Sequence, residues 1–370
     1  METKYKKLLR YRIALTLIPG VGDIIGKKLV SYCGGVEAIF KEKKANLLKI
    51  PSVGETLVNA IVNHDMFDRV DKEMAFIEKF NIKPLFYLDA AYPMRLKQCT
   101  DSPMMLYYIG NADLNMPKIV SVVGTRNITE YGKDICKKLV TDLASQEILI
   151  VSGLAYGVDT CAHKTANDNN LPTVAVLAHG LDRVYPVLNK PLAEKMINHG
   201  GLLTEFMSET NPDRENFPKR NRIIAGIADA VIVVEAAKRG GALITADIAN
   251  SYNRDVFAVP GKLTDTFSEG CNHLIKTNKA ALIQSADDLL YIMGWEENKR
   301  PKKTAQRQLF IELKPEEQII YDLLSQKTSS SIDELCINSK LNVSKIAEAL
   351  LSLELEGIIK AMPGKVYKLV

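Results

Sequence analysis

The chain contains, at residues 119–126, the run Ile119-Val120-Ser121-Val122-Val123-Gly124-Thr125-Arg126. Its first five residues carry no charge and are rich in β-branched side chains, which is typical of a strand buried on both faces. A glycine turn follows, and then a helical pattern from about Glu130. Similar strand-like runs recur at 148–151, 173–177, 202–204, 229–235 and 256–259. Because helical segments separate most of these runs, we predict an α/β fold with an extended Rossmann-like parallel sheet over 117–293.

Both flanks of this segment have patterns of their own. Residues 1–65 contain a repeat of helix, glycine turn and helix, around Ile18-Pro19-Gly20-Val21-Gly22 and Ile50-Pro51-Ser52-Val53-Gly54. The repeat is similar to helix-hairpin-helix motifs, whose turn amides contact DNA phosphates, although a purely structural helical module fits the pattern as well. We expect 66–116 to be a connecting region that packs on the core. A polar linker is predicted at 294–314, and three helices with a hairpin at 315–370 predict a winged helix.

Composition limits the classes of function. Among 370 residues, 48 Lys and Arg stand against 44 Asp and Glu, so any nucleic-acid surface must be local. No run of eighteen apolar residues and no signal-peptide core are present, and we expect a cytoplasmic protein. The six cysteines form no C-x-x-C pair. His163 follows Asp159 by four residues without a visible third ligand, so we predict neither a metal site nor a cofactor.

A second stretch, Phe217-Pro218-Lys219-Arg220-Asn221-Arg222, places three cations within four positions and continues into apolar residues at helical spacing. We predict a buried helix with a basic first turn, because fixed cations, free backbone donors and a positive helix end all attract phosphate. Phe217 offers either a face on which a base stacks or an anchor for the helix. A solvated charge run on an ordinary surface helix is the alternative.

Glycine-rich turns follow three of the predicted strands: Gly124-Thr125-Arg126, Ser152-Gly153 with Gly157, and Gly240-Gly241. Ligands of open parallel sheets bind at the carboxyl ends of the strands, so three converging turns and the basic stretch predict a polyanionic ligand. The glycines could instead serve only to permit tight turns. No P-loop and no G-x-G-x-x-G after the first strand are present, which disfavours nucleoside triphosphate and NAD.

Signals for catalysis are sparse. The sequence has no G-x-S-x-G elbow and no H-E-x-x-H motif, and we predict no catalytic residue. Asp159 and Glu235 lie near turn positions. Their carboxylates suit acid–base chemistry, but they suit helix capping or pairing with the basic stretch equally well.

The motifs at 121–126, 152–159, 217–226, 233–236 and 256–261, taken in order, resemble the DprA/Smf family, DNA-processing protein A. The resemblance spans about Pro103 to Leu290. It implies a homodimer that binds single-stranded DNA during natural transformation, protects it and loads the RecA recombinase onto it, without catalytic activity.

Family DNA contacts carry over to Arg126, to the Ser152-Gly153 turn and to the basic stretch after Phe217. A departure from the family pattern at Arg239-Gly240-Gly241-Ala242 removes hydroxyl groups and adds a cation. The candidate DNA-binding residues are therefore Gly124, Thr125, Arg126, Ser152, Gly153, Phe217, Lys219, Arg220, Asn221, Arg222, Arg239 and Gly240.

The predicted winged helix has the wrong charge for a DNA reader. Residues 315–357 hold eight acidic residues and three lysines, a net charge of −5. Because DNA readers rely on cations, we expect a protein-contact or regulatory role for this segment. For the whole chain, a nucleotide-processing enzyme of a related Rossmann-type family and a transcription regulator are the alternative functions.

Overall fold

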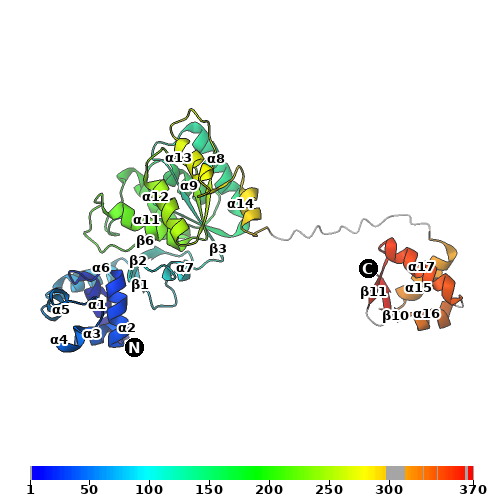
Figure 1. Ribbon diagram of the computed structural model, residues 1–370, viewed down its shortest axis with the longest axis horizontal. Helices are drawn as coiled ribbons and strands as arrows, with labels where there is room; N and C mark the ends of the chain where they lie inside the picture. The colour runs from blue at the N-terminus through cyan, green and yellow to red at the C-terminus, as the bar shows by residue number, and fades with distance from the viewer. Residues whose placement is uncertain (1, 297–312, 328, 340, 363–365, 370) are drawn as a thin grey trace. The chain divides into compact units, whose positions relative to one another are not determined.

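The computed structural model describes residues 2–296, 313–327, 329–339, 341–362 and 366–369. The chain divides into two compact units, Met1–Glu296 and Glu297–Val370 (Figure 1). Most of the predicted linker at 294–314 lies outside the described residues. The finer division of the first unit into helical, connecting and α/β parts stays a prediction. None of the helices in these described ranges is both long and apolar enough to cross a membrane.

The first unit is built on a nine-stranded sheet with the order β1-β2-β6-β5-β4-β3-β7-β8-β9. The strands from β6 to β9 in this order pair in parallel, whereas β1 and β2 are antiparallel to their neighbours. Their bounds are β1 Lys83–Phe86, β2 Met105–Gly110, β3 Lys118–Val123, β4 Ile148–Ser152, β5 Thr173–Val176, β6 Gly201–Thr204, β7 Ala230–Val233, β8 Asp255–Ala258 and β9 Ala281–Leu282. The Rossmann-like parallel sheet predicted from the alternating runs is confirmed.

Helices cover both faces of this sheet. Alternate side chains of a strand point to opposite faces, so in β3 the residues Ile119 and Val123 pack with α11 and α12, while Val120 and Val122 pack with α8 and α9. The helices of this part are α7 Met94–Lys97, α8 Glu130–Asp142, η1 Leu143–Gln146, α9 Val158–Asp168, η2 Val187–Asn189, α10 Lys190–His199, α11 Asn216–Ile227, α12 Gly241–Ser251, α13 Glu269–Lys276 and α14 Ala286–Ile292.

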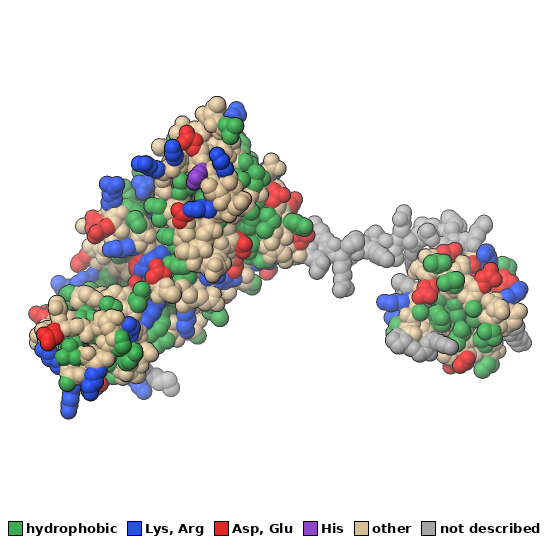
Figure 2. All heavy atoms as spheres, in the orientation of Figure 1, with side chains coloured by type: hydrophobic (Ala, Val, Ile, Leu, Met, Phe, Trp, Pro, Cys, Tyr) green, Lys and Arg blue, Asp and Glu red, His purple; other side chains and the backbone are tan. Residues whose placement is uncertain are grey.

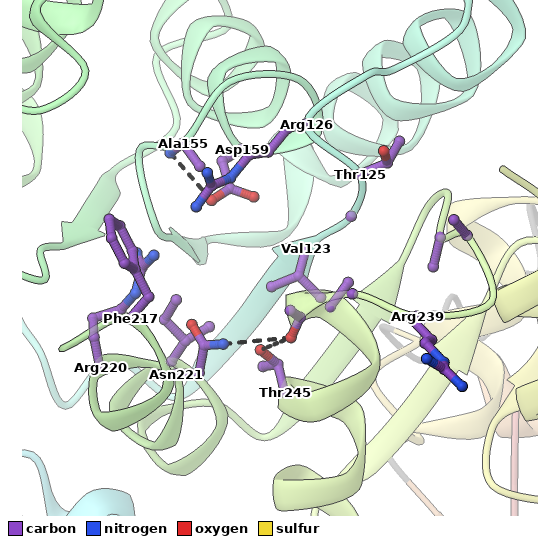
Figure 3. A pocket seen from close by; sticks show the side chains of 17 residues that line it. Val123, Thr125, Arg126, Ala155, Asp159, Phe217, Arg220, Asn221, Arg239 and Thr245 are labelled. Carbon is purple, nitrogen blue, oxygen red and sulfur yellow. Dashed lines mark hydrogen bonds between the residues drawn. The ribbon is translucent and has the colours of Figure 1, made fainter. Parts of the chain in front are cut away.

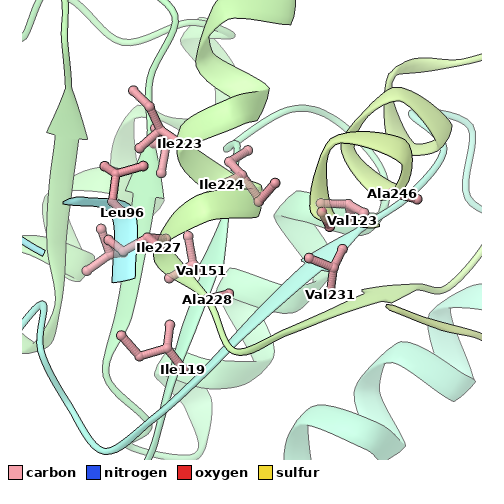
Figure 4. Close-up of a cluster of buried hydrophobic side chains, with 14 of the residues drawn as sticks. Leu96, Ile119, Val123, Val151, Ile223, Ile224, Ile227, Ala228, Val231 and Ala246 are labelled. Carbon is pink, nitrogen blue, oxygen red and sulfur yellow. The ribbon is translucent and has the colours of Figure 1, made fainter. Parts of the chain in front are cut away.

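Helix α11 contains the predicted basic stretch and is anchored by its apolar half. Ile223, Ile224 and Ile227 are at most 2% exposed and lie over the sheet (Figure 4). Burial of three such side chains contributes several kcal/mol to folding. The first turn of α11 is thereby fixed at the carboxyl end of the central strands.

The N-terminal helices are α1 Glu2–Leu17, α2 Asp23–Cys33, α3 Val36–Ile39, α4 Lys44–Leu47, α5 Glu55–Val62 and α6 Phe67–Lys79. They share one apolar cluster with β1 and β2, so residues 66–116 contribute strands to the sheet and do more than connect two parts. Helix α2, which follows the first glycine turn, packs on this region. The Met104 amide donates to Asp23 (2.7 Å), and a Cβ on Gly26 would lie 2.2 Å from the Met104 sulfur.

The second unit has three helices, α15 Pro315–Ser325, α16 Ile332–Ser339 and α17 Val343–Leu355, and a small sheet of β10 Ser330–Ser331, β11 Ile359–Met362 and β12 Val366–Leu369. The strand order is β10-β12-β11. Ile320, Leu335 and Ile346, one from each helix, meet in its core. This arrangement confirms the predicted winged helix.

Candidate nucleic-acid interface

A cavity lies where the strand order of the sheet reverses. β3 is the first parallel strand of the chain, with β4, β5 and β6 on one side and β7, β8 and β9 on the other. The turns after β3, β4 and β7 meet at this reversal, as expected for open α/β sheets. They enclose a volume of about 310 Å³. Its lining residues are Val123, Gly124, Thr125, Arg126, Ala155, Asp159, Phe217, Arg220, Asn221, Ile224, Ala236, Ala237, Arg239, Gly240, Gly241, Ala242 and Thr245.

Three exposed arginines supply positive charge around this cavity. Arg126 and Arg239 line it, and Arg126 also borders an adjoining hollow together with Arg214. Within the ranges that the structure describes, none of the three guanidinium groups makes a hydrogen bond or an ion pair. In Figure 3, Arg126 extends from the turn after β3, and Arg239 lies on the turn that precedes α12. These cations are therefore free to meet an anionic ligand.

Phe217 stands between the cavity and the adjoining hollow. Its ring is half-buried and projects from the first turn of α11 (Figure 3). The Arg126 guanidinium carbon lies 5.3 Å from the ring centroid, and the Tyr185 ring lies at 6.2 Å with an interplanar angle of 57°. Cation–π and tilted ring contacts of this kind fix the ring's orientation. Phe217 is thus held as part of the wall.

Arg220 has a different place from the one predicted. It is 4% exposed, and its Nη1 donates to the carbonyls of Gly153 and Val176, both at 2.7 Å. Burial lowers the pKa of Arg220 to about 10, with the Asp159 charge acting in the opposite direction. Both hydrogen bonds hold neighbouring strand ends together, and Arg220 lines the cavity as a buried cation. Its predicted contact with DNA stays a prediction.

Ser152 and Gly153 also have internal roles. The Ser152 hydroxyl is fully buried and donates to the Val122 carbonyl at 2.6 Å. A Cβ on Gly153 would lie 1.9 Å from the Arg220 guanidinium. The Ser152 side chain is therefore not available to DNA. Position 153 has no room for a side chain because the Arg220 guanidinium packs against it.

Arg222 lies away from the cavity. Its guanidinium forms ion pairs with Glu205 and Asp23 and donates to the Asp101 carbonyl. Asp23 begins α2, so Arg222 ties α11 to the N-terminal helices. Lys219 is exposed and has no partner among the described side chains, but it lines none of these hollows. The three cations of the predicted cluster therefore do not face one pocket.

The remaining predicted residues reach the cavity. Asn221 is 8% exposed, and its amide donates to the Gly241 carbonyl at 3.4 Å, which links α11 to the turn before α12. Gly124 and Thr125 lie in the turn after β3, where the Thr125 amide donates to the Glu235 carbonyl at 2.7 Å. Gly240 has open space where a side chain would stand, so its backbone is accessible to a ligand.

Both candidate acid–base carboxylates are engaged in the fold. Glu235 is 1% exposed and accepts hydrogen bonds from the Thr129 amide and hydroxyl at the start of α8. Asp159 accepts from the amides of Gly153 (3.1 Å) and Ala155 (3.3 Å), while burial raises its pKa. These contacts are those of capping groups.

His163 is a buried structural histidine. Its Nδ1 lies 2.7 Å from the Thr173 hydroxyl, and burial lowers its pKa to about 3. Among the described residues, no group of three or more His, Cys, Asp or Glu side chains is arranged to hold a metal ion.

Sequence reasoning missed Arg214, Tyr156 and Tyr185. All three are exposed and border the hollows that adjoin Phe217. They lie in loops, where no periodicity marks a shared face. The only available signal was the presence of large side chains beside the turns that follow parallel strands.

Helix α17 of the second unit exposes apolar side chains, whereas a DNA-binding helix would expose cations. Val343, Leu351 and Leu355 on α17 are 60–80% exposed. Figure 2 shows hydrophobic side chains over the middle of this unit's visible face, with both acidic and basic side chains around them. This face supports the expectation of a protein contact.

Comparison with known proteins identifies the family. Residues 83–294 match the family model described as DNA recombination-mediator protein A, and 301–365 match that of the DprA winged helix domain. The chain belongs to the DprA/Smf family. The first match covers the nine-stranded sheet from β1 onward, including every turn at the cavity.

Relatives of this DprA-family chain include the DNA processing protein DprA of Streptococcus pneumoniae, 38% identical over 68% of this chain and 96% of that protein. Protein Smf of Synechocystis is 31% identical over 97% of this chain and 98% of its own length. The crystal structure of the S. pneumoniae protein superposes with a TM-score of 0.67, at 36% identity, over 76% of this chain and 97% of that one.

A structure of DNA processing protein A from Helicobacter pylori, described for its single-stranded DNA binding mode, is also similar. It matches with a TM-score of 0.53 and 28% identity, over 58% of this chain and 96% of that chain.

Proposed function

We propose that this chain binds single-stranded DNA in a groove with two parts. One part is the cavity where the strand order reverses, called the switch-point cavity below, and the other is the adjoining hollow bordered by Arg126 and Arg214. The observation that carries the proposal is the set of three exposed guanidinium groups of Arg126, Arg214 and Arg239, which have no hydrogen-bond or ion-pair partner among the described residues and lie around the ring of Phe217. Cations along a groove track the phosphate backbone, and an aromatic face binds a base of any sequence by stacking. Both features suit an unpaired strand, because a duplex keeps its bases stacked inside.

The H. pylori relative is described as binding single-stranded DNA, which supports this proposal. In place of the predicted Lys219, Arg220 and Arg222 cluster, the proposed contacts are Arg126, Arg214, Phe217 and Arg239, with the backbone of Gly124, Thr125 and Gly240. Arg220 and Asn221 hold the wall in position.

The experiment that tests the proposal compares binding of a labelled dT oligonucleotide with a blunt duplex of equal length by fluorescence anisotropy, over a salt series. We expect tighter binding of the single strand, little dependence on its sequence, and an affinity that falls linearly in log–log form with salt. Equal affinity for the duplex at every salt concentration would contradict it.

We further propose that the chain acts as a cytoplasmic homodimer that protects incoming DNA in natural transformation and loads the RecA recombinase. The family description as a recombination mediator supports this role. The test is the rate of RecA filament formation on DNA covered by single-strand binding protein, which the chain is expected to increase. Sedimentation at micromolar concentration tests the dimer.

We propose that the chain performs no catalysis. Asp159 and Glu235, the two carboxylates best placed for acid–base chemistry, are already bound by backbone amides. Incubation with nucleoside monophosphates and with single-stranded DNA is expected to give no product. Hydrolysis that disappears in a Glu235→Gln variant would favour the nucleotide-processing alternative instead.

A further inference from the structure

A second aromatic surface lies beside Phe217, next to the cavity at the strand-order reversal. Arg126, Tyr156, Tyr185 and Phe217 border a small hollow of about 20 Å³ there. The hollow is too small to enclose a base, so a ligand would lie across its rim. We call the rim formed by Tyr156, Tyr185 and Phe217 the aromatic rim.

The two tyrosines of the rim are exposed, and their hydroxyl groups are unpaired within the described ranges. Tyr156 is 44% and Tyr185 43% exposed, and neither hydroxyl makes a hydrogen bond among the described residues. Aromatic side chains contribute most to stability when they are buried. Two open rings next to a cation and a third ring therefore form a surface suited to a flat ligand.

The loops that present these rings are fixed in place. Leu154 and Gly157, on either side of the Tyr156 segment, have positive φ values of 59° and 80°. The Asn189 amide group donates to the Leu154 carbonyl and to the Thr160 hydroxyl, both at 2.8 Å. It thereby joins the loop after β4 to the segment that carries Tyr185. A preorganised surface of this kind loses little entropy on binding.

Further exposed apolar side chains adjoin the aromatic rim in the chain. The Tyr185 ring contacts Phe217 at 6.2 Å. Val187 and Leu188 in η2 follow Tyr185 closely in the chain and are 73% and 78% exposed. Exposed apolar side chains therefore continue from Tyr185 into η2.

We propose that the aromatic rim is a second base-binding subsite, in which a nucleotide next to the one at the cavity stacks its base across the rings of Tyr156 and Tyr185. The inference rests on the proposed function, since it extends the path of the same strand. Arg126 lines both the cavity and the hollow, so its guanidinium meets the phosphate between the two nucleotides. The strand then continues over the apolar surface toward η2.

The test uses the full-length chain and a dT oligonucleotide. Tyr156→Ala and Tyr185→Ala are each expected to weaken binding by roughly fivefold or more, with the salt slope unchanged, because stacking releases no counterion. Tyr156→Phe keeps the ring and is expected to bind more tightly than Tyr156→Ala. Tyr291→Ala is the matched control, since Tyr291 is 72% exposed on α14 and should bind like the parent.

Tyr156→Trp gives a spectroscopic readout that a structural role would not produce. The parent has a single tryptophan, Trp295. Saturating dT should quench the emission of the variant but not that of the parent, and an abasic strand of equal length should not quench it. Parent affinity in both alanine variants, or bound strand without quenching, would overturn the subsite and leave the proposed function standing. If the parent itself fails to bind single strands, the proposed function fails first.

Discussion

The Arg126 guanidinium lies 5.3 Å from the centroid of the Phe217 ring, although the two residues come from the turn after β3 and the first turn of α11. The contact joins the proposed phosphate-binding group to the proposed base-stacking group at the cavity wall. Since neither side chain is buried, each can be changed without opening the core.

Arg126→Ala is expected to weaken binding to all single-stranded sequences alike. The log–log salt slope should fall by about 0.7, because one phosphate contact with a single strand releases about that much counterion. Salt-series anisotropy measures it. Lys137→Ala, an exposed lysine on α8, is the control and should leave the slope unchanged. An unchanged affinity and slope for Arg126→Ala would show that this turn does not bind phosphate.

Phe217→Ala should cost about 1–3 kcal/mol of binding free energy with the salt slope unchanged, since stacking carries no counterion term. The ring is half-buried, so the melting temperature should fall much less than in Ile227→Ala. Ile227 is fully buried on the same helix, and its truncation should cost about 2–5 kcal/mol of stability. Equal melting losses in both variants would identify Phe217 as an anchor.

Arg220→Ala should act on stability. The change removes the hydrogen bonds from Arg220 to the carbonyls of Gly153 and Val176, and it removes the positive charge that favours the ionised form of the buried Asp159 carboxyl. We expect the free energy of unfolding to fall by on the order of 3 kcal/mol in urea titrations. Lys219→Ala, one position earlier and exposed, should change it by less than about 0.5 kcal/mol. A fully stable Arg220→Ala variant would contradict this role.

The buried His163 should make the first unit sensitive to acid. Its pKa is about 3 when folded and about 6.5 when unfolded, so below pH 6.5 the unfolded state binds the additional proton. Stability from this group is therefore complete above pH 6.5 and decreases as the pH falls. Between pH 6.5 and 5 the loss should approach about 2 kcal/mol. His163→Gln should flatten the urea-determined stability over this range, and an unchanged pH dependence would contradict the assignment.

Truncation after Glu296 should leave single-strand affinity within about threefold, roughly 0.7 kcal/mol. The cut retains Trp295, whose amide donates to the Leu290 carbonyl at 2.8 Å, so the first unit stays intact. Anisotropy with dT measures the affinity. A loss of tenfold or more would show that the removed segment contacts DNA directly.

Sequence alone determined the elements and the location of the site. Uncharged runs rich in β-branched residues, such as 119–123, are typical of buried strands. The glycine turns that follow them mark one edge of a parallel sheet. The winged helix followed from its own local periodicity. These features depend on residues that are close together in the chain, so they can be predicted from the sequence alone.

Tertiary structure decided which side chains line the candidate site. An α-helix turns by about 100° per residue, so Lys219, Arg220 and Arg222, adjacent in the sequence, point to solvent, to the strand ends and to α2. Arg214, Tyr156 and Tyr185 share one groove because the sheet brings their separate loops together. The sequence showed that cations lie near Phe217. Only packing determined that, among the described residues, Arg126, Arg214 and Arg239 are unpaired while Arg220 and Arg222 are held by the fold.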